Sequence, residues 1–341
     1  MLTGTVVVCT RDRRQVLRQC LASLDQQIPE RALDVLVVDD GSRDGTADDL
    51  RRWAAADAGR RVVHQAPAGL SAARNAGLRA AAGDVVLFCD DDALAPPAWA
   101  RAHLAAYERP GVVAVGGPVH LAFPDGCPPW VTPALHHWWS ALEGEDEPGP
   151  FPPPHGPYGT NLSVRRAAAL AVGGFPTWLG RQGASLLSSE EAELSRRLGD
   201  AGGILWWEPA APVLHQIGAG RLRRRWLVRR GAAQGRSNAR REALGAGTTP
   251  DPAAQARRAA VQLREAARIA RGLVAATVAP GAAPAPGPPP PGPAAGRRMD
   301  DLGRLVGHAA AGVEHLRLAR SARRPGAHAA PVPAAAPGRG A

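Results

Sequence analysis

The first 120 residues alternate between short apolar runs and longer segments in which apolar residues recur every three or four positions. The short runs predict strands, and the periodic segments predict helices. Because the strands are almost continuously apolar, they suit a parallel sheet that is buried on both faces. The expected strands are 3–9, 34–39, 61–64, 84–89 and 112–117, and the expected helices are 13–27, 46–57, 70–82 and 97–108. This alternation predicts an α/β fold with a doubly wound, mostly parallel sheet.

The pattern changes after residue 120, where a stretch rich in proline and tryptophan predicts an irregular loop up to about residue 158. Regular patterning then resumes up to about residue 241. Its expected elements are a strand at 160–165, a helix at 189–201, strands at 204–207 and 212–215, and a basic helix at 221–241.

The chain therefore divides into a folded part and a tail. Residues 1–245 are expected to form one domain, with a first half at 1–120 and a second half at 121–245. Residues 246–341 are rich in alanine and proline, and Pro280–Pro293 predicts an extended linker. Helices at 252–273 and 299–321 fit the pattern, but we expect most of this tail to be disordered.

Charge divides the chain at an earlier point, near residue 220. Residues 1–220 hold 19 arginines and 25 acidic residues, whereas residues 221–341 hold 22 arginines and 6 acidic residues. The four cysteines form no CxxC pair, which favours a reducing compartment, and no run of about 18 apolar residues predicts a membrane span. We therefore expect a cytoplasmic protein.

Carboxylates are concentrated where two predicted strands end. Asp39 and Asp40 follow one apolar run, and Asp90, Asp91 and Asp92 follow another. Acidic groups this close repel one another unless a cation or ligand hydroxyls relieve the repulsion. Since parallel sheets bind ligands at the carboxyl ends of their strands, both groups are expected in one cleft.

Two common nucleotide-binding patterns are missing. The first strand leads into Cys9-Thr10-Arg11-Asp12 without a GxGxxG loop, and the chain has no P-loop sequence. Nicotinamide-dependent enzymes and P-loop nucleotidases are therefore disfavoured.

An ordered series of motifs over residues 3–240 resembles family 2 glycosyltransferases, which have the GT-A fold. The segments that carry this resemblance are 6–13, 37–46, 69–77, 83–92, 159–166, 172–175 and 189–198. Each segment alone is weakly specific, but their common order is a strong signal. The resemblance implies an inverting, metal-dependent transfer of sugar from a nucleoside diphosphate sugar to a hydroxyl acceptor.

The resemblance also implies roles for individual residues. Asp92 and His215 would hold Mn²⁺ or Mg²⁺, and Asn161, Gly174 and Phe175 would lie on the acceptor side. The residues expected to bind the nucleotide sugar are Thr10, Asp12, Asp40, Arg74, Asp90 and Asp91.

Glu190 and Glu191 stand where the family usually has a Glu-Asp pair, and Glu191 aligns with the catalytic base. A carboxylate there could take the proton of the acceptor hydroxyl. The structural alternative is an acidic first turn that complements the helix dipole.

The basic segment 221–241 carries nine arginines and has three interpretations. It can be a solvated helix that folds over the donor site, or it can contact an anionic membrane surface, which would place the protein at the inner face of the cell membrane. Nucleic-acid binding is the third interpretation, and the acidic remainder of the chain argues against it.

A glycosyltransferase is thus the expected function, with UDP as the expected nucleotide and with a polysaccharide, lipid-linked or small-molecule acceptor. A nucleotidyltransferase and a non-catalytic sugar-nucleotide-binding or scaffold protein are the alternatives. A nucleotidyltransferase normally opens with a glycine-rich loop, which this chain lacks.

Overall fold

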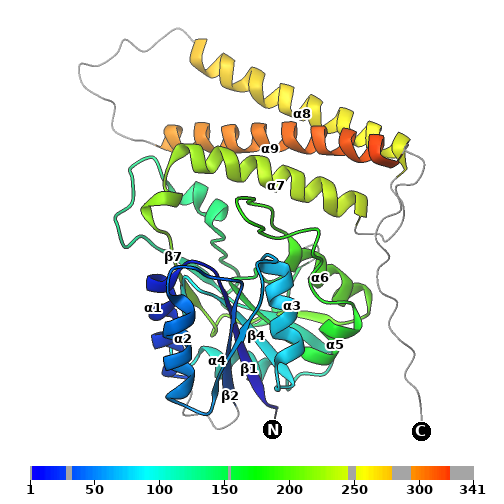
Figure 1. Cartoon of the computed structure of the whole chain (residues 1–341). Helices are drawn as coiled ribbons and strands as arrows, with labels where there is room; N and C mark the ends of the chain where they lie inside the picture. Colours follow the sequence, from blue (N-terminus) through cyan, green and yellow to red (C-terminus); the bar gives the residue numbers. More distant parts are fainter. Residues whose placement is uncertain (1, 28–32, 153–154, 245–250, 279–292, 323–341) are drawn as a thin grey trace.

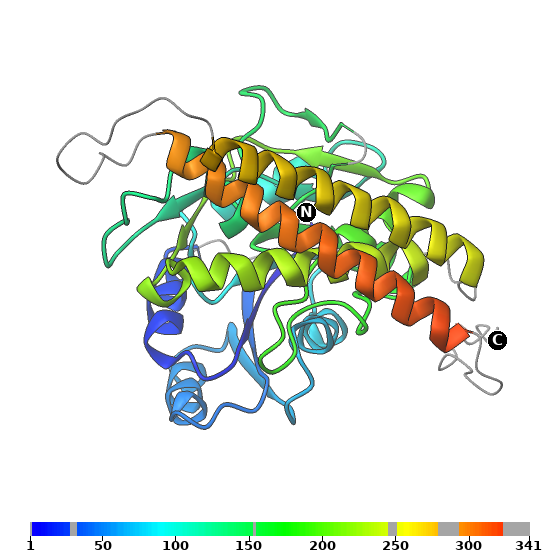
Figure 2. The ribbon, with the colours of Figure 1, turned by 90° about the horizontal axis from the view of Figure 1, so that it is seen from above.

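A computed structural model describes residues 2–27, 33–152, 155–244, 251–278 and 293–322. It consists of an α/β domain with a layer of three long helices lying across one end (Figure 1). Figure 2 views this layer from above, where its helices lie side by side over the domain.

The main sheet has eight strands in the order β3-β2-β1-β4-β9-β6-β10-β8. Strands β1 to β4 are mutually parallel where they pair, and β9 runs antiparallel to both β4 and β6. The strands are β1 (Gly4–Thr10), β2 (Leu33–Asp39), β3 (Arg60–His64), β4 (Val85–Asp90), β6 (Val112–Gly116), β8 (Gly149–Pro150), β9 (Asn161–Arg165) and β10 (Ile204–Trp207). The expected mixed, mostly parallel sheet is confirmed.

Helices cover both faces of this sheet. On one face, α1 (Arg14–Asp25), α2 (Thr46–Ala55) and α4 (Trp99–Ala106) contribute buried residues to one core. On the other face, α3 (Leu70–Ala80), α5 (Arg166–Ala171) and α6 (Glu190–Asp200) contribute to a second core. The apolar strand residues alternate between these cores, which explains why the strands read as continuous apolar runs.

A second, smaller sheet lies beside the carboxyl end of β4. It has the order β5-β11-β7 and consists of β5 (Ala93–Leu94), β7 (Val119–Ala122) and β11 (Val213–Gln216). Two short 3₁₀ helices are η1 (Pro133–Trp139), within the predicted loop, and η2 (Ala219–Arg221). His215 of β11 pairs with Ala93 of β5, so this sheet brings His215 close to the acidic residues that end β4.

The helical layer consists of α7 (Arg224–Leu244), α8 (Pro252–Val278) and α9 (Pro293–Ala322). The helices α8 and α9 correspond to the segments 252–273 and 299–321, where helices fit the sequence pattern, whereas the central part of the predicted linker, 280–292, lies outside the described residues. No helix in the described part of the chain is both long enough and apolar enough to cross a bilayer.

Small residues explain why an alanine- and glycine-rich segment can pack as helices. A Cβ atom on Gly231 of α7 would overlap the carbonyl oxygen of Gly303 of α9, and Gly235 meets Gly307 in the same way. The absence of side chains lets the two helix backbones approach closely. An ion pair between Arg240 and Glu314, at 2.8 Å, adds to this contact.

Candidate active site

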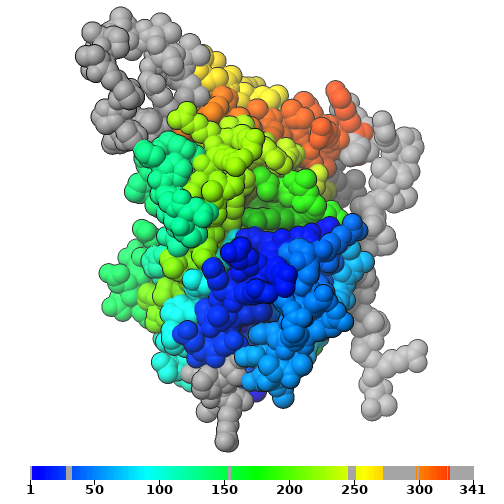
Figure 3. Space-filling view, turned by 60° about the vertical axis from the view of Figure 1, so that its left-hand side comes forward, coloured from blue at the N-terminus to red at the C-terminus, as the bar shows by residue number. Residues whose placement is uncertain are grey.

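A cavity of about 560 Å³ opens at the carboxyl end of the main sheet, between the α/β domain and α7. Figure 3 shows the same arrangement as a solid surface, with the blue N-terminal elements below the yellow-green and orange helical layer. The register of the sheet creates this site, because Thr10 pairs with Asp39 of β2, and its neighbour Cys9 pairs with Asp90 of β4. The two acidic groups therefore meet at one edge, as the sequence predicts.

The three consecutive aspartates each have a different set of partners. Asp90 accepts hydrogen bonds from Arg74 at 2.8 Å and from Thr160 at 2.9 Å. Asp91 accepts one from the Thr10 hydroxyl at 2.8 Å, and burial raises its pKa to about 7. Burial alone would raise the pKa of Asp92 too, but nearby His215 and arginines hold that pKa well below its usual range.

Asp92 and His215 form the candidate metal site. The His215 Nδ1 atom lies 2.9 Å from the Trp139 carbonyl oxygen, which can only accept, so Nδ1 carries the hydrogen. The lone pair on Nε2 then faces Asp92 Oδ1 at 3.4 Å. Two acceptors that face each other at this distance suit a shared cation, and an imidazole held through its other nitrogen is the usual metal ligand.

Arginines neutralise Asp92 in the structure. Arg13 and Arg221 donate to its Oδ2 atom at 2.7 and 2.9 Å, and Arg221 also lies 3.2 Å from His215 Nε2. Within the described residues, no group of three or more His, Cys, Asp or Glu side chains could hold a metal ion. An ion at Asp92 and His215 would therefore need ligands from a substrate, as is common for ions that bind phosphates.

Arg74 connects the acidic strand end to the catalytic helix predicted from the sequence. It is 3% exposed and donates to Glu190 at 2.7 Å, in addition to its bond to Asp90. Its guanidinium also lies 5.5 Å from the centre of the Phe175 ring. An arginine held by two carboxylates fixes the position of α6 relative to β4.

Glu190 and Glu191 have different environments. Both line the cavity, but Glu190 is buried and bound to Arg74, whereas Glu191, among the described residues, has no side-chain hydrogen bond. Burial raises the pKa of Glu191 to about 7, and the charge of Glu190 adds to this effect. A carboxylate that is free to accept a proton near neutral pH has the properties of a general base.

Side chains of α7 hold the turn that precedes these glutamates. Gln234 donates to the Ser189 hydroxyl at 3.0 Å and accepts from the Ser188 hydroxyl at 3.0 Å. Arg230 and Ser237 also bind Ser188, at 3.0 and 2.9 Å. Ser189 has a φ of 72°, a left-handed conformation that is rare for residues other than glycine.

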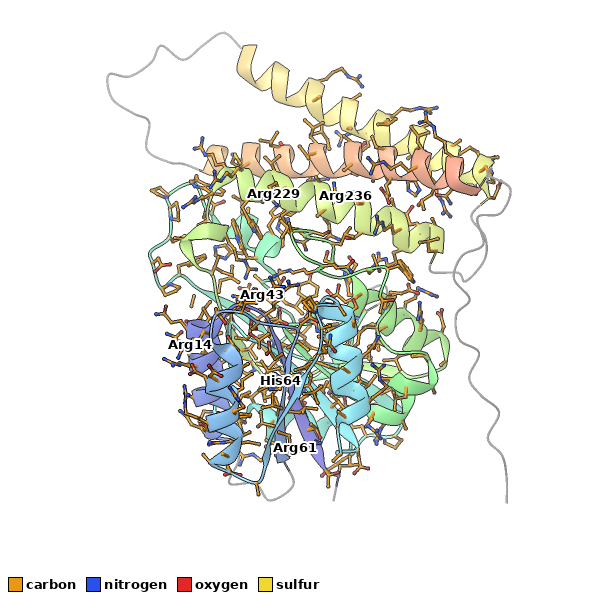
Figure 4. The ribbon with its side chains drawn as sticks, viewed as in Figure 1. Arg14, Arg43, Arg61, His64, Arg229 and Arg236 are labelled. Atoms are coloured by element: carbon orange, nitrogen blue, oxygen red, sulfur yellow. The ribbon has the colours of Figure 1, made fainter. Side chains whose placement is uncertain are left out.

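Asp40 and Asp12 line the cavity near the ends of β2 and β1. Asp40 accepts three hydrogen bonds, from Gln65 at 2.7 Å and from the backbone of Ala68 and Gly69 at 2.8 and 2.9 Å. Asp12 accepts one from the backbone of Arg43, which is labelled in Figure 4. Both carboxylates thus shape loops at the rim, and both also line the cavity.

Comparison with known proteins identifies the family. The model described as Glycosyl transferase family 2 matches residues 5–171. The glucosyl-dolichyl phosphate glucuronosyltransferase of Haloferax volcanii is 32% identical over 251 residues, which are 68% of this chain and 75% of that protein. The chain belongs to glycosyl transferase family 2. It is a nucleotide-sugar glycosyltransferase.

Solved structures of glycosyltransferases share the fold. A mannosyltransferase from Pyrobaculum calidifontis, in complex with GDP-Man and Mn²⁺, has a TM-score of 0.52 at 20% identity and covers 94% of this chain and 74% of that one. GalNAc-T7 with UDP, GalNAc and Mn²⁺ also has a TM-score of 0.52, at 16% identity, and covers 71% of this chain. This chain spans about half of that structure, at 51%. The fold is therefore of the GT-A type.

The residues expected on the acceptor side of this glycosyltransferase lie outside the cavity lining. Asn161 is fully buried, where its amide binds Trp99, His103 and the carbonyl oxygens of Pro118 and Ala211. These contacts join β9 to its neighbours and leave Asn161 no capacity to bind an acceptor.

Gly174 and Phe175 also lie outside the cavity lining. A Cβ atom on Gly174 would lie 2.5 Å from Asn75 Oδ1, and Phe175 is 1% exposed with its ring against Phe88. Their motif supports the wall behind Arg74 and does not line the cavity.

The basic segment 221–241 is also placed differently from a free membrane-binding helix. Figure 4 shows Arg229 and Arg236 on α7, the helix between the α/β domain and α9. Arg221 binds Asp92, Arg230 lines the cavity and Arg240 binds Glu314. The structure therefore favours the interpretation in which this helix folds over the donor site.

Sequence reasoning missed several residues of the site. Arg13, Arg181, Ser188 and Arg230 line the cavity, and Arg221 reaches Asp92 from η2. Arg13 could have been found from its position three residues after the first strand. The others lie in loops and helices whose place in space only the fold reveals.

Proposed function

We propose that this glycosyltransferase transfers its sugar with inversion at the anomeric carbon and that Glu191 is the general base. The observation that carries the proposal is the position of Glu191, which lines the cavity, has no side-chain partner in the described part of the chain and has a pKa of about 7. A single displacement assisted by one base inverts the configuration of the anomeric carbon. Glu190, held by Arg74, supports Glu191 and raises its pKa.

The donor nucleotide occupies the side of the cavity formed by the ends of β1 and β2. Asp40 reads the base, and Thr10 and Asp12 lie beside it, since all three line that part of the cavity. Asp90 and Asp91 face the ribose and the donor sugar, and Arg74 holds Asp90 in place.

Asp92 and His215 are the residues that would hold Mn²⁺ or Mg²⁺, because their facing oxygen and nitrogen atoms suit a shared cation. When bound, such an ion stabilises the negative charge that grows on the diphosphate leaving group. Arg13 and Arg221, which lie on Asp92, are placed to bind phosphate oxygens at the same point.

UDP is the proposed nucleotide, as in the complex of GalNAc-T7, although GDP in the mannosyltransferase complex makes GDP-sugars the first alternative. The acceptor presents a hydroxyl group to Glu191. A lipid-linked sugar is one candidate, because the Haloferax relative is named for transfer to glucosyl-dolichyl phosphate. A cytoplasmic location is part of the proposal and is supported by the four free cysteines.

A nucleotide screen combined with base variants tests this proposal. UDP- and GDP-sugars are added with and without Mn²⁺, and the melting temperature and the release of nucleotide are measured. Glu191→Gln should keep nucleotide-dependent stabilisation but lose transfer by about 10²- to 10⁴-fold, the usual contribution of a general base. The matched control is Glu108→Gln, an exposed residue at the end of α4. Full transfer activity in Glu191→Gln would refute the assigned base.

A further inference from the structure

The outer helices of the helical layer present a strongly basic surface. Residues 252–271 of α8 contain five arginines and one acidic residue, Glu265, and all five arginines are exposed. The neighbouring helix α9 adds further exposed arginines. The exposed arginines of the two helices are Arg257, Arg258, Arg264, Arg268, Arg271, Arg297, Arg304, Arg317 and Arg320.

Most of this charge is not neutralised within the layer. Glu265 is bound by Arg268, at 2.6 Å in the shortest contact. Arg257 and Arg317 lie 3.8 and 3.6 Å from Asp251 and Glu314. Arg264 and Arg271 form no ion pair with a carboxylate of the described residues. Along α8, Arg257 and Arg271 are 14 residues apart, which corresponds to about 21 Å of helix. This row of charge is too long to be matched by one small anion.

Apolar side chains lie among these arginines. The described residues contain seven large apolar side chains that are exposed, and four of them belong to α8 and α9. They are Val261, Leu263, Val313 and Leu316, with exposed fractions of 60%, 40%, 47% and 38%. Exposed apolar groups among arginines are typical of helices that bind at a lipid–water interface.

A groove runs along the same surface. It has a volume of about 560 Å³ and is lined by Val261, Arg264, Arg268, Arg271 and His308, together with Gln262 and Glu265. It lies on α8 and α9, apart from the active-site cavity, which is lined by α7. The positive charge of its arginines suits the negative charge of a phosphate headgroup.

We propose that the outer face of α8 and α9 docks the protein on an anionic membrane surface. The arginines bind lipid phosphates, and the four apolar side chains enter the boundary between headgroups and acyl chains. The inference does not depend on the transferase reaction, because this face takes no part in the cavity. The membrane contact expected from the sequence lay in the segment 221–241, whereas the proposed contact lies on the two helices that follow that segment.

Vesicle co-sedimentation of the full chain tests the proposal without any activity measurement. The vesicles consist of phosphatidylcholine with or without phosphatidylglycerol, at low and high salt. We expect binding only to the anionic vesicles and a loss of binding at high salt. Each arginine near an anionic surface contributes about fivefold to binding, so Arg264→Gln/Arg271→Gln should weaken it about 25-fold.

The control is Arg51→Gln/Arg79→Gln, which changes the net charge equally on α2 and α3 of the α/β domain. Absence of binding to anionic vesicles, or equal weakening by both double variants, would overturn the proposal. Release from vesicles by millimolar inorganic phosphate would also overturn it, since the face would then bind a small free anion. Val261→Ser should weaken vesicle binding further if the apolar side chains enter the membrane.

Discussion

Gln234 of α7 offers a test of how the helical layer supports catalysis. Its side chain donates to Ser189 and accepts from Ser188, each at 3.0 Å, and these serines immediately precede the two glutamates of α6. Gln234 itself lies outside the cavity lining. Replacing it with alanine therefore removes support from the turn that carries Glu191, without removing a group that contacts substrate.

The magnitude follows from the strain at Ser189. A left-handed conformation costs a residue other than glycine about 1–2 kcal/mol, and the φ of Ser189 is 72°. Two hydrogen bonds at about 1 kcal/mol each offset this strain. Without them the turn is less favoured by about 1–2 kcal/mol, so the equilibrium constant for the conformation with Glu191 in place falls about 5- to 30-fold.

Steady-state kinetics measure the effect. We expect Gln234→Ala to lower kcat by up to about 30-fold while KM for the donor stays unchanged, because the donor side of the cavity is intact. Asn238→Ala is the matched control, since Asn238 accepts a hydrogen bond from Gln234 at 2.9 Å but does not bind the serines. That variant should retain most of its kcat.

Ser189→Gly provides a second check. Glycine adopts a positive φ without steric strain, so Gln234→Ala should cost less in the Ser189→Gly protein than in the unmodified chain. An unchanged kcat in Gln234→Ala would refute the reasoning, as would a loss of equal size in both backgrounds.

Three further predictions concern the site and its support. The transfer rate should fall as the pH is lowered through about 7, because protonation of Glu191 removes the base, and a flat pH–rate profile would contradict this. Asp92→Asn should abolish the extra thermal stabilisation that Mn²⁺ gives to the nucleotide complex, and stabilisation equal to that of the unmodified protein would exclude Asp92 as a ligand. Asn161→Ala should lower the free energy of unfolding in urea by about 3 kcal/mol, since it leaves several buried partners unpaired, while KM for both substrates stays unchanged.

The order of strands and helices in the α/β domain could be predicted from the sequence. Apolar runs and helical periodicity are local signals, and burial on both faces of a parallel sheet makes them strong. The acidic strand ends were predictable for the same reason. Thr10 and Asp90 end parallel strands, and Asp40 directly follows one. The geometry of the sheet therefore brings all three to one edge.

Short elements and backbone-supporting motifs were less predictable. The two-residue strands β5 and β8 are too short to carry a periodic signal. The motif around Asn161, Gly174 and Phe175 reads as part of a site, but its polar and small residues satisfy buried partners instead. A motif does not reveal whether its side chains face a cavity or the protein interior.

By itself, then, the sequence determined the alternating sheet architecture, the acidic edge and the candidate base, because each depends on neighbours along the chain. Only the tertiary structure decided which distant groups meet. Arg74 reaches Glu190 across 116 positions, and His215 meets Asp92 because β11 pairs with β5. The helices α7 and α9 likewise pack closely because their glycines face each other, and neither segment reveals this match alone.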